Sequence, residues 1–133
     1  MFGYGEIKAI SVHVGDPTAD RVVSLWRAPM ACEILSAYVV DSVTLAAGTA
    51  NYWEGHLENG GTAGTGTTAI TANLGGTAAG GTAPGWTANT PQAYTVSEGT
   101  LASGEWVNLD YDETGTVTPD ITIIMNVVYG IGA

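Results

Sequence analysis

The segment from Ile121 to Tyr129 places apolar side chains at every second position, a pattern that few folds can accommodate. Ile121, Ile123, Met125, Val127 and Tyr129 share one side if the backbone is extended, because successive strand residues point to opposite faces. A helix would scatter these five residues around its axis. The segment therefore predicts a β-strand with one face in the core, and it has the clearest core face in the sequence.

Further segments of the same kind are separated by turn residues. They cover residues 6–14, 21–27, 31–43, 51–58, 93–96 and 105–111, and in the fourth of them Trp53 and Leu57 share the expected core face. Gly15-Asp16-Pro17 and Thr114-Gly115-Thr116 are typical turn sequences. The sequence shows no convincing long helix and no alternation of strands with helices. It predicts an all-β fold, a single-domain β-sandwich over residues 1–133 that resembles a jelly roll.

One long segment differs from the strands by its small, uncharged side chains. Residues 59–97 carry no charge, and 25 of the 31 residues from 60 to 90 are Gly, Thr or Ala. Such a segment has little side chain to pack and much backbone entropy to lose. We expect a long excursion over residues 60–90 that a partner surface covers, with at most a short helical turn at residues 67–74 placing Ile70 and Leu74 on one side.

The charge balance excludes several kinds of partner. The 133 residues include 13 Asp and Glu against 3 Lys and Arg, a net charge of −10. A nucleic-acid-binding surface or a basic membrane-binding surface is therefore not expected. Cys32 is the single cysteine, so no intrachain disulfide can form, and no signal peptide or long apolar span is evident. These features predict a protein that is present in the cytoplasm before any assembly.

Residues suited to metal binding or catalysis are few. Cys32, His13 and His56 are the only residues of the soft-ligand and general-base types, too few for a structural zinc site. Glu54, His56 and Glu58 alternate on one face of a strand, about 7 Å apart from the rise per residue. A metal site there is conceivable, but a solvated polar face is the favoured interpretation.

A partial calcium-loop pattern begins at Asp110. Asp110, Asp112 and Gly115 match its start, but the twelfth position is Ile121, which cannot supply the closing carboxylate. An acidic hairpin turn is favoured over a weak Ca²⁺ site at Asp110 and Asp112. The G-x-S-x-G and phosphate-loop patterns are also missing. We expect no metal, no cofactor and no enzymatic activity.

Several apolar and aromatic residues are candidate assembly contacts. Trp86 lies in the small-residue segment, and Trp106 falls on the face opposite Val107 and Leu109. Large aromatic residues are common interface anchors, although Trp86 could equally dock on its own domain. Residues 1–5 combine aromatic residues with glycine, which is typical of a terminal arm. The full set of candidate contacts is Phe2, Tyr4, Ile70, Leu74, Trp86 and Trp106.

Runs spread along the chain resemble those of known viral proteins. They are WRAPMACEILSAYVV at residues 26–40, AGTANY at 47–52, NGGT at 59–62 and LASGEWV at 101–107. Together they are similar to small β-sandwich head decoration, or cement, proteins of tailed bacteriophages. This resemblance implies a protein that binds the major capsid protein on the outside of the shell, commonly as a homotrimer, and stabilises it. It brings no catalytic residues.

The sequence is also compatible with two other functions. A carbohydrate- or receptor-binding β-sandwich of a phage tail or baseplate would stack sugars on exposed Tyr52, Trp86 or Trp106. Such a protein would need a concave groove lined by these rings. An acid-based hydrolase would need two carboxylates in a cleft with perturbed pKa values.

Overall fold

The computed structural model describes residues 5–76 and 81–130. Within these ranges the chain forms strands joined by turns and loops, with no helix long and apolar enough to cross a membrane. The strands are β1 (Ile7–Gly15), β2 (Arg21–Arg27), β3 (Cys32–Asp41), β4 (Tyr52–Gly61), β5 (Thr68–Ala69), β6 (Gln92–Tyr94), β7 (Thr100–Leu101), β8 (Trp106–Thr114) and β9 (Ile121–Tyr129).

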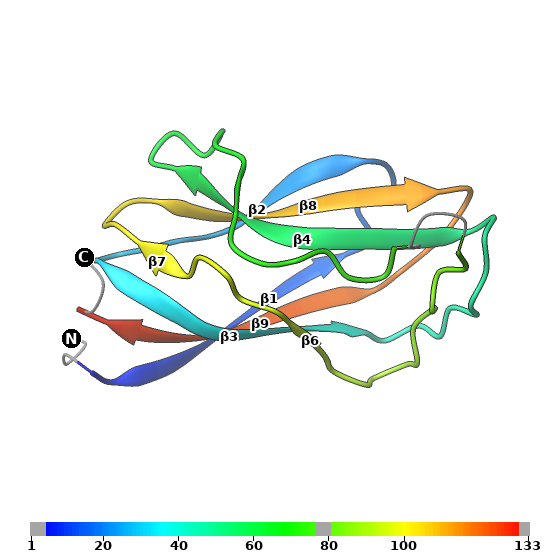
Figure 1. Cartoon of the computed structure of the whole chain (residues 1–133), viewed down its shortest axis with the longest axis horizontal. Coiled ribbons are helices and arrows are strands. Elements are labelled where there is room, and N and C mark those ends of the chain that lie inside the picture. Colours follow the sequence, from blue (N-terminus) through cyan, green and yellow to red (C-terminus); the bar gives the residue numbers. More distant parts are fainter. Residues whose placement is uncertain (1–4, 77–80, 131–133) are drawn as a thin grey trace.

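The strands are arranged in two antiparallel sheets that lie in separate layers (Figure 1). The first, sheet A, has the order β1-β9-β3-β6, with β7 also paired to β3; the second, sheet B, has the order β2-β8-β4-β5. Buried apolar side chains from both sheets form one core, including Ile34 and Met125 from sheet A and Leu57 and Leu109 from sheet B. This arrangement confirms the predicted all-β sandwich.

The alternation in the sequence decides which side of each strand is buried. In β9 the five predicted core residues are all buried, and in β4 Trp53 and Leu57 are fully buried as expected. β3 pairs with β9 through a bulge between Ile34 and Ser36, so Leu35 is the extra residue and is 47% exposed. Extra residues of this kind bend a strand and redirect its side chains.

The small-residue segment folds against its own domain. The expected helical turn at residues 67–74 is wrong: β5 pairs with Glu58 and Asn59 of β4, and Leu74 bridges to Gly55. The backbone N–H of Ile70 donates to Leu57 O at 2.8 Å, and that of Ala72 donates to Thr95 O at 3.0 Å. These contacts link β4 of sheet B to Thr95, the residue directly after β6 of sheet A, so the segment closes one side of the sandwich.

Trp86 holds the second half of this segment in place. Its ring stacks on Trp53 with centroids 4.3 Å apart and planes 4° apart, and its backbone pairs with Leu45. The close approach requires glycine nearby: Gly85 has φ +75°, and a Cβ there would lie 2.3 Å from Leu45 O. Glycine alone adopts such a backbone without strain, which gives the glycines of the segment a packing role.

Candidate functional site

The outer side of sheet A is a nearly uncharged surface. Register and burial place twelve side chains on it, from β1, β3 and β9, and we call this set the neutral face: Ile7, Ala9, Ser11, His13, Glu33, Leu35, Ser36, Tyr38, Val40, Thr122, Ile124 and Asn126. Glu33 is the one carboxylate of the set. Ile7 and Leu35 are large apolar residues with 60% and 47% of their surface exposed. A surface of this composition can be covered by a partner at little desolvation cost.

The outer side of sheet B has the opposite character. Paired positions of β4 and β8 place four carboxylates there, and we call this set the acidic face: Glu54, His56 and Glu58 from β4 with Asn108, Asp110 and Asp112 from β8. Partial burial raises the pKa of Asp112, and the nearby carboxylates of Asp110, Asp20 and Glu54 raise it further. Four of the 13 Asp and Glu residues therefore share the outer side of sheet B, whereas the outer side of sheet A carries one, which makes the neutral face the candidate binding surface.

The predicted assembly contacts have different positions in the fold. Ile70 is fully buried and Trp86 is 4% exposed, so both pack within their own domain and neither presents a side chain to a partner. Leu74 packs against the core and Trp106 lies next to Gly64; both are half-buried and keep some exposed surface. Phe2 and Tyr4 lie outside the described residues. For Trp86 the structure shows docking on its own domain, the second of the two possibilities left open by the sequence, because Trp53 offers an apolar ring within reach.

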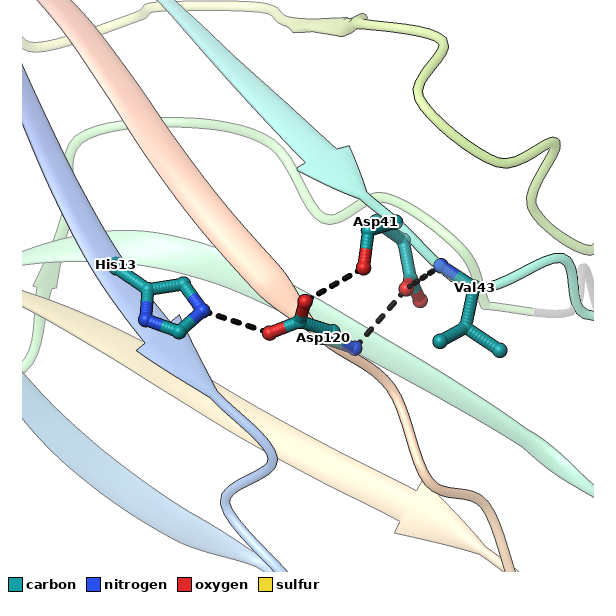
Figure 2. Close-up of polar contacts among 5 residues, drawn as sticks. His13, Asp41, Val43 and Asp120 are labelled. Atoms are coloured by element: carbon teal, nitrogen blue, oxygen red, sulfur yellow. Dashed lines mark hydrogen bonds and ion pairs between the residues drawn. The ribbon is translucent and has the colours of Figure 1, made fainter.

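A hydrogen-bonded cluster lies where β3 ends and β9 begins (Figure 2). Asp41 is buried, and its Oδ1 accepts from the backbone N–H of Val43 at 2.9 Å and of Asp120 at 3.0 Å. Its Oδ2 accepts from the indole Nε1 of Trp53 at 3.0 Å. Three donors compensate the burial of this carboxylate, which therefore fastens loops and strands of both sheets.

The exposed part of this cluster contains a serine, a histidine and an aspartate, the residue types of a nucleophilic triad. Their spatial order differs from that of a triad. The hydroxyl of Ser42 donates to Asp120 Oδ2 at 2.5 Å, and His13 Nε2 lies 2.6 Å from Asp120 Oδ1. Figure 2 shows Asp120 between His13 and the end of β3. In a triad the imidazole stands between hydroxyl and carboxylate so that it can take the hydroxyl proton. Here the carboxylate stands between them, so the cluster supports loop structure and does not activate Ser42.

The calcium-loop pattern is not a loop in the structure. Asp110 and Asp112 lie within β8, which continues to Thr114, and the turn begins only at Gly115. Both carboxylates point to the outer side of sheet B, whereas a calcium loop would wrap its ligands around the ion. The Ca²⁺ site considered for Asp110 and Asp112 is therefore not supported by this geometry.

His56, Glu58 and Asp110 form a compact cluster on the acidic face. His56 and Glu58 lie on one side of β4, as the alternation predicts. The pairing of β4 with β8 brings Asp110 directly opposite His56. His56 Nε2 lies 3.3 Å from Glu58 Oε2 and 3.8 Å from Asp110 Oδ2. The contribution of Asp110 could not be found from the sequence, because it depends on which strands pair and in which register.

The described residues do not form a groove in which sugars could stack on exposed aromatic rings. One shallow hollow near the small-residue segment is lined by Leu74, Trp86 and Gln92 among others, but the Trp86 ring is stacked on Trp53 and has little exposed surface. Tyr52 and Trp106 do not line the hollows identified in this part of the chain. The carbohydrate-binding alternative gains no support from these features.

The fold is a two-sheet β-sandwich with one neutral and one acidic outer face. It is similar to a chain of the solved structure described as "Capsid of Ralstonia phage GP4", with a TM-score of 0.65 and 15% sequence identity. The match covers 99% of this chain and 92% of that chain. At this identity the likeness is one of fold. Comparisons with protein-family models and with curated proteins found no match.

Proposed function

We propose that this protein is a structural protein of a bacteriophage virion, which binds the outside of the capsid as a homotrimer and stabilises the shell. The observation that carries the proposal is the fold match to a chain of a phage capsid. Because the match spans nearly all of both chains, it compares two proteins of similar size and not one domain of a much larger subunit. This supports an accessory shell protein that binds the major capsid protein.

The distribution of charge suggests how such a protein would bind. The neutral face offers exposed Ile7 and Leu35 with few charges to desolvate, so it is the surface that we assign to the capsid. The acidic face would then point to solvent, where its carboxylates other than the buried Glu58 are open to water and aid solubility. The net charge of −10 also disfavours binding to the nucleic acid inside the shell. Leu74 and Trp106, which keep some exposed surface, stay candidates for contacts between protomers.

Stabilisation would follow from mass action. A protein that binds the assembled shell but not its separated subunits shifts the equilibrium toward the shell, and many copies add their effects. No catalytic step is needed for this role. The compact sandwich provides a rigid body for it, because its open side is closed by its own small-residue segment.

Binding to phage heads that lack the protein tests the proposal. The purified chain is sedimented with such heads, and its mass in solution is measured by light scattering. We expect saturable binding, a trimer mass, and heads that withstand higher temperature when coated. If the chain stays in the supernatant at all concentrations, the proposal is wrong, and a glycan array then tests the carbohydrate-binding alternative.

A matched pair of variants tests which face binds. Ser11 and Ser24 are both exposed serines on edge strands, Ser11 on the neutral face and Ser24 on the outer side of sheet B. Ser11→Glu should weaken binding to heads at least tenfold, because a charge would be buried against the shell. Ser24→Glu should bind as the unchanged protein does. Equal binding by both variants would remove the neutral face from the proposal.

A further inference from the structure

We propose that His56, Glu58 and Asp110 bind a divalent transition-metal ion of the zinc type, through one imidazole nitrogen and two carboxylates. This site does not depend on the proposed function. Among the described residues, these three form the group whose ligand atoms lie close enough for a shared ion, all within 4.8 Å of one another.

The distances between the ligand atoms suit a small ion with little movement. Two ligands bound to zinc at 2.0–2.2 Å lie roughly 3–3.5 Å apart. His56 Nε2 already lies 3.3 Å from Glu58 Oε2 and 3.8 Å from Asp110 Oδ2. The strands hold this spacing, because Glu58 follows His56 by two residues on β4 and Asp110 is the cross-strand partner of His56 on β8. The site is therefore largely preformed on rigid backbone.

The burial of Glu58 is a second and independent observation. Glu58 is only 4% exposed, and its Oε1 has no hydrogen-bond donor among the described residues. Asn108 is the cross-strand partner of Glu58, and its buried Oδ1 likewise lacks a donor within the described ranges, while its Nδ2 donates to Gly64 O. Glu58 Oε1 and Asn108 Oδ1 are both hydrogen-bond acceptors, so neither can donate a hydrogen bond to the other. A buried carboxylate oxygen without a donor is costly, and a cation bound by Glu58 would reduce that cost.

The charge and chemistry of the cluster select the class of ion. Two carboxylates and a neutral imidazole carry a formal charge of −2, which a divalent cation balances. Imidazole nitrogen favours zinc and its transition-metal neighbours, whereas calcium and magnesium prefer oxygen ligands alone. The side chains of His56 and Asp110 are 24% and 30% exposed, so the ion can enter from solvent and keep a water as its fourth ligand.

Zn²⁺ titration of the untagged full chain after removal of bound metal tests the site. We expect one Zn²⁺ per chain by calorimetry at pH 7.5, a rise in Tm of about 5 °C or more at saturation, and displacement of the His56 ring signals in NMR spectra. Cobalt(II), as a probe, should give a visible absorption band of nitrogen and oxygen coordination. Absence of Zn²⁺ binding in the unchanged chain would overturn the proposal.

His13 provides a matched control, because it also contacts a carboxylate, that of Asp120, at 2.6 Å. His56→Gln should weaken Zn²⁺ binding at least tenfold and abolish the Tm rise, whereas His13→Gln should leave both unchanged. Binding that survives His56→Gln, or Ca²⁺ binding as tight as Zn²⁺ binding, would overturn the proposal in favour of a general affinity of the acidic face for cations. The cobalt spectrum of the unchanged chain decides the question if His56→Gln fails to fold.

Discussion

The indole Nε1 of Trp53 donates a hydrogen bond of 3.0 Å to Oδ2 of Asp41, and so joins a central strand of sheet B to the end of a central strand of sheet A. The same Trp53 ring stacks on Trp86 and lies 5.6 Å from the ring of Tyr111. One side chain thus connects both sheets and the small-residue segment. The stability of the sandwich should depend strongly on the residues around it.

Replacing Asp41 tests this connection. Asp41→Ala removes the acceptor of the Trp53 indole and of the Val43 and Asp120 backbone N–H groups, all close to the core. Leaving these donors unpaired should lower the free energy of unfolding by about 3 kcal/mol or more. Urea unfolding measures the loss. The neighbouring change Ser42→Ala removes one exposed hydrogen bond and should cost far less; a similar loss in both variants would contradict the central role of Asp41.

Trp86→Ala tests whether the small-residue segment is held by its aromatic residue. The substitution should lower the free energy of unfolding by about 3–5 kcal/mol, because it removes a large buried ring and leaves a cavity against Trp53. Limited proteolysis should then cut within residues 60–90. Trp106→Ala is the control, since Trp106 is only half-buried. Equal stability losses would show that the stacked ring has no special importance.

Gly85→Ala tests the close approach of two backbones. Gly85 has φ +75°, and a Cβ would lie 2.3 Å from Leu45 O, so the variant should lose about 1–3 kcal/mol in unfolding free energy. Gly48 lies in the same pairing but has no heavy atom within 4 Å of an added Cβ. Gly48→Ala should therefore be close to neutral. Thermal unfolding compares the two, and a neutral Gly85→Ala would contradict the described contact.

Asp120 gives the protein a pH-dependent contribution to stability. The Ser42 hydroxyl and the His13 imidazole hold the pKa of Asp120 below its ordinary value. The stabilisation is present above the unfolded-state pKa of about 3.9 and is lost as the pH falls through the folded-state pKa.

The difference in unfolding free energy between the unchanged protein and Asp120→Asn should therefore shrink as the pH is lowered from about 5 to about 2. Urea unfolding across this range measures the difference. Ser42→Ala removes the larger cause of the pKa shift, so in that variant the pH-dependent loss should be smaller and should be complete at a higher pH. A difference that is constant down to pH 2 would contradict the shift.

The strands could be predicted because alternation is a local property of the sequence. β2 and β9 have the predicted ends, and Trp53 and Leu57 occupy the expected core face. The short strands β5 and β7 were not predicted, because two residues carry no period. Their existence depends on the longer strands to which they pair.

The small-residue segment shows where local patterns fail. Gly, Thr and Ala are compatible with an arm, a loop or a backbone that packs closely, and the sequence alone does not distinguish these. The outcome depends on Trp53, 33 positions before Trp86, as a stacking partner for it. The same limit applies to Asp110, whose approach to His56 is set by the pairing of β4 with β8. The position of Asp41 is different, because the sequence does contain a signal for it. An acidic residue directly after a run of apolar strand residues indicates a carboxylate that could accept hydrogen bonds at the end of that strand.

The closure of one side of the sandwich has a consequence for association between molecules. The small-residue segment runs along the side bounded by β5 and β6, whereas β1 and β2 are the edge strands on the other side. Exposed strand edges are templates for pairing with further chains. The long exposed strand edges, those of β1 and β2, therefore lie on one side of the sandwich. Pairing of β1 with β1, or of β2 with β2, of a second copy is self-complementary and uses up that edge in both molecules, which limits extension along the sheet.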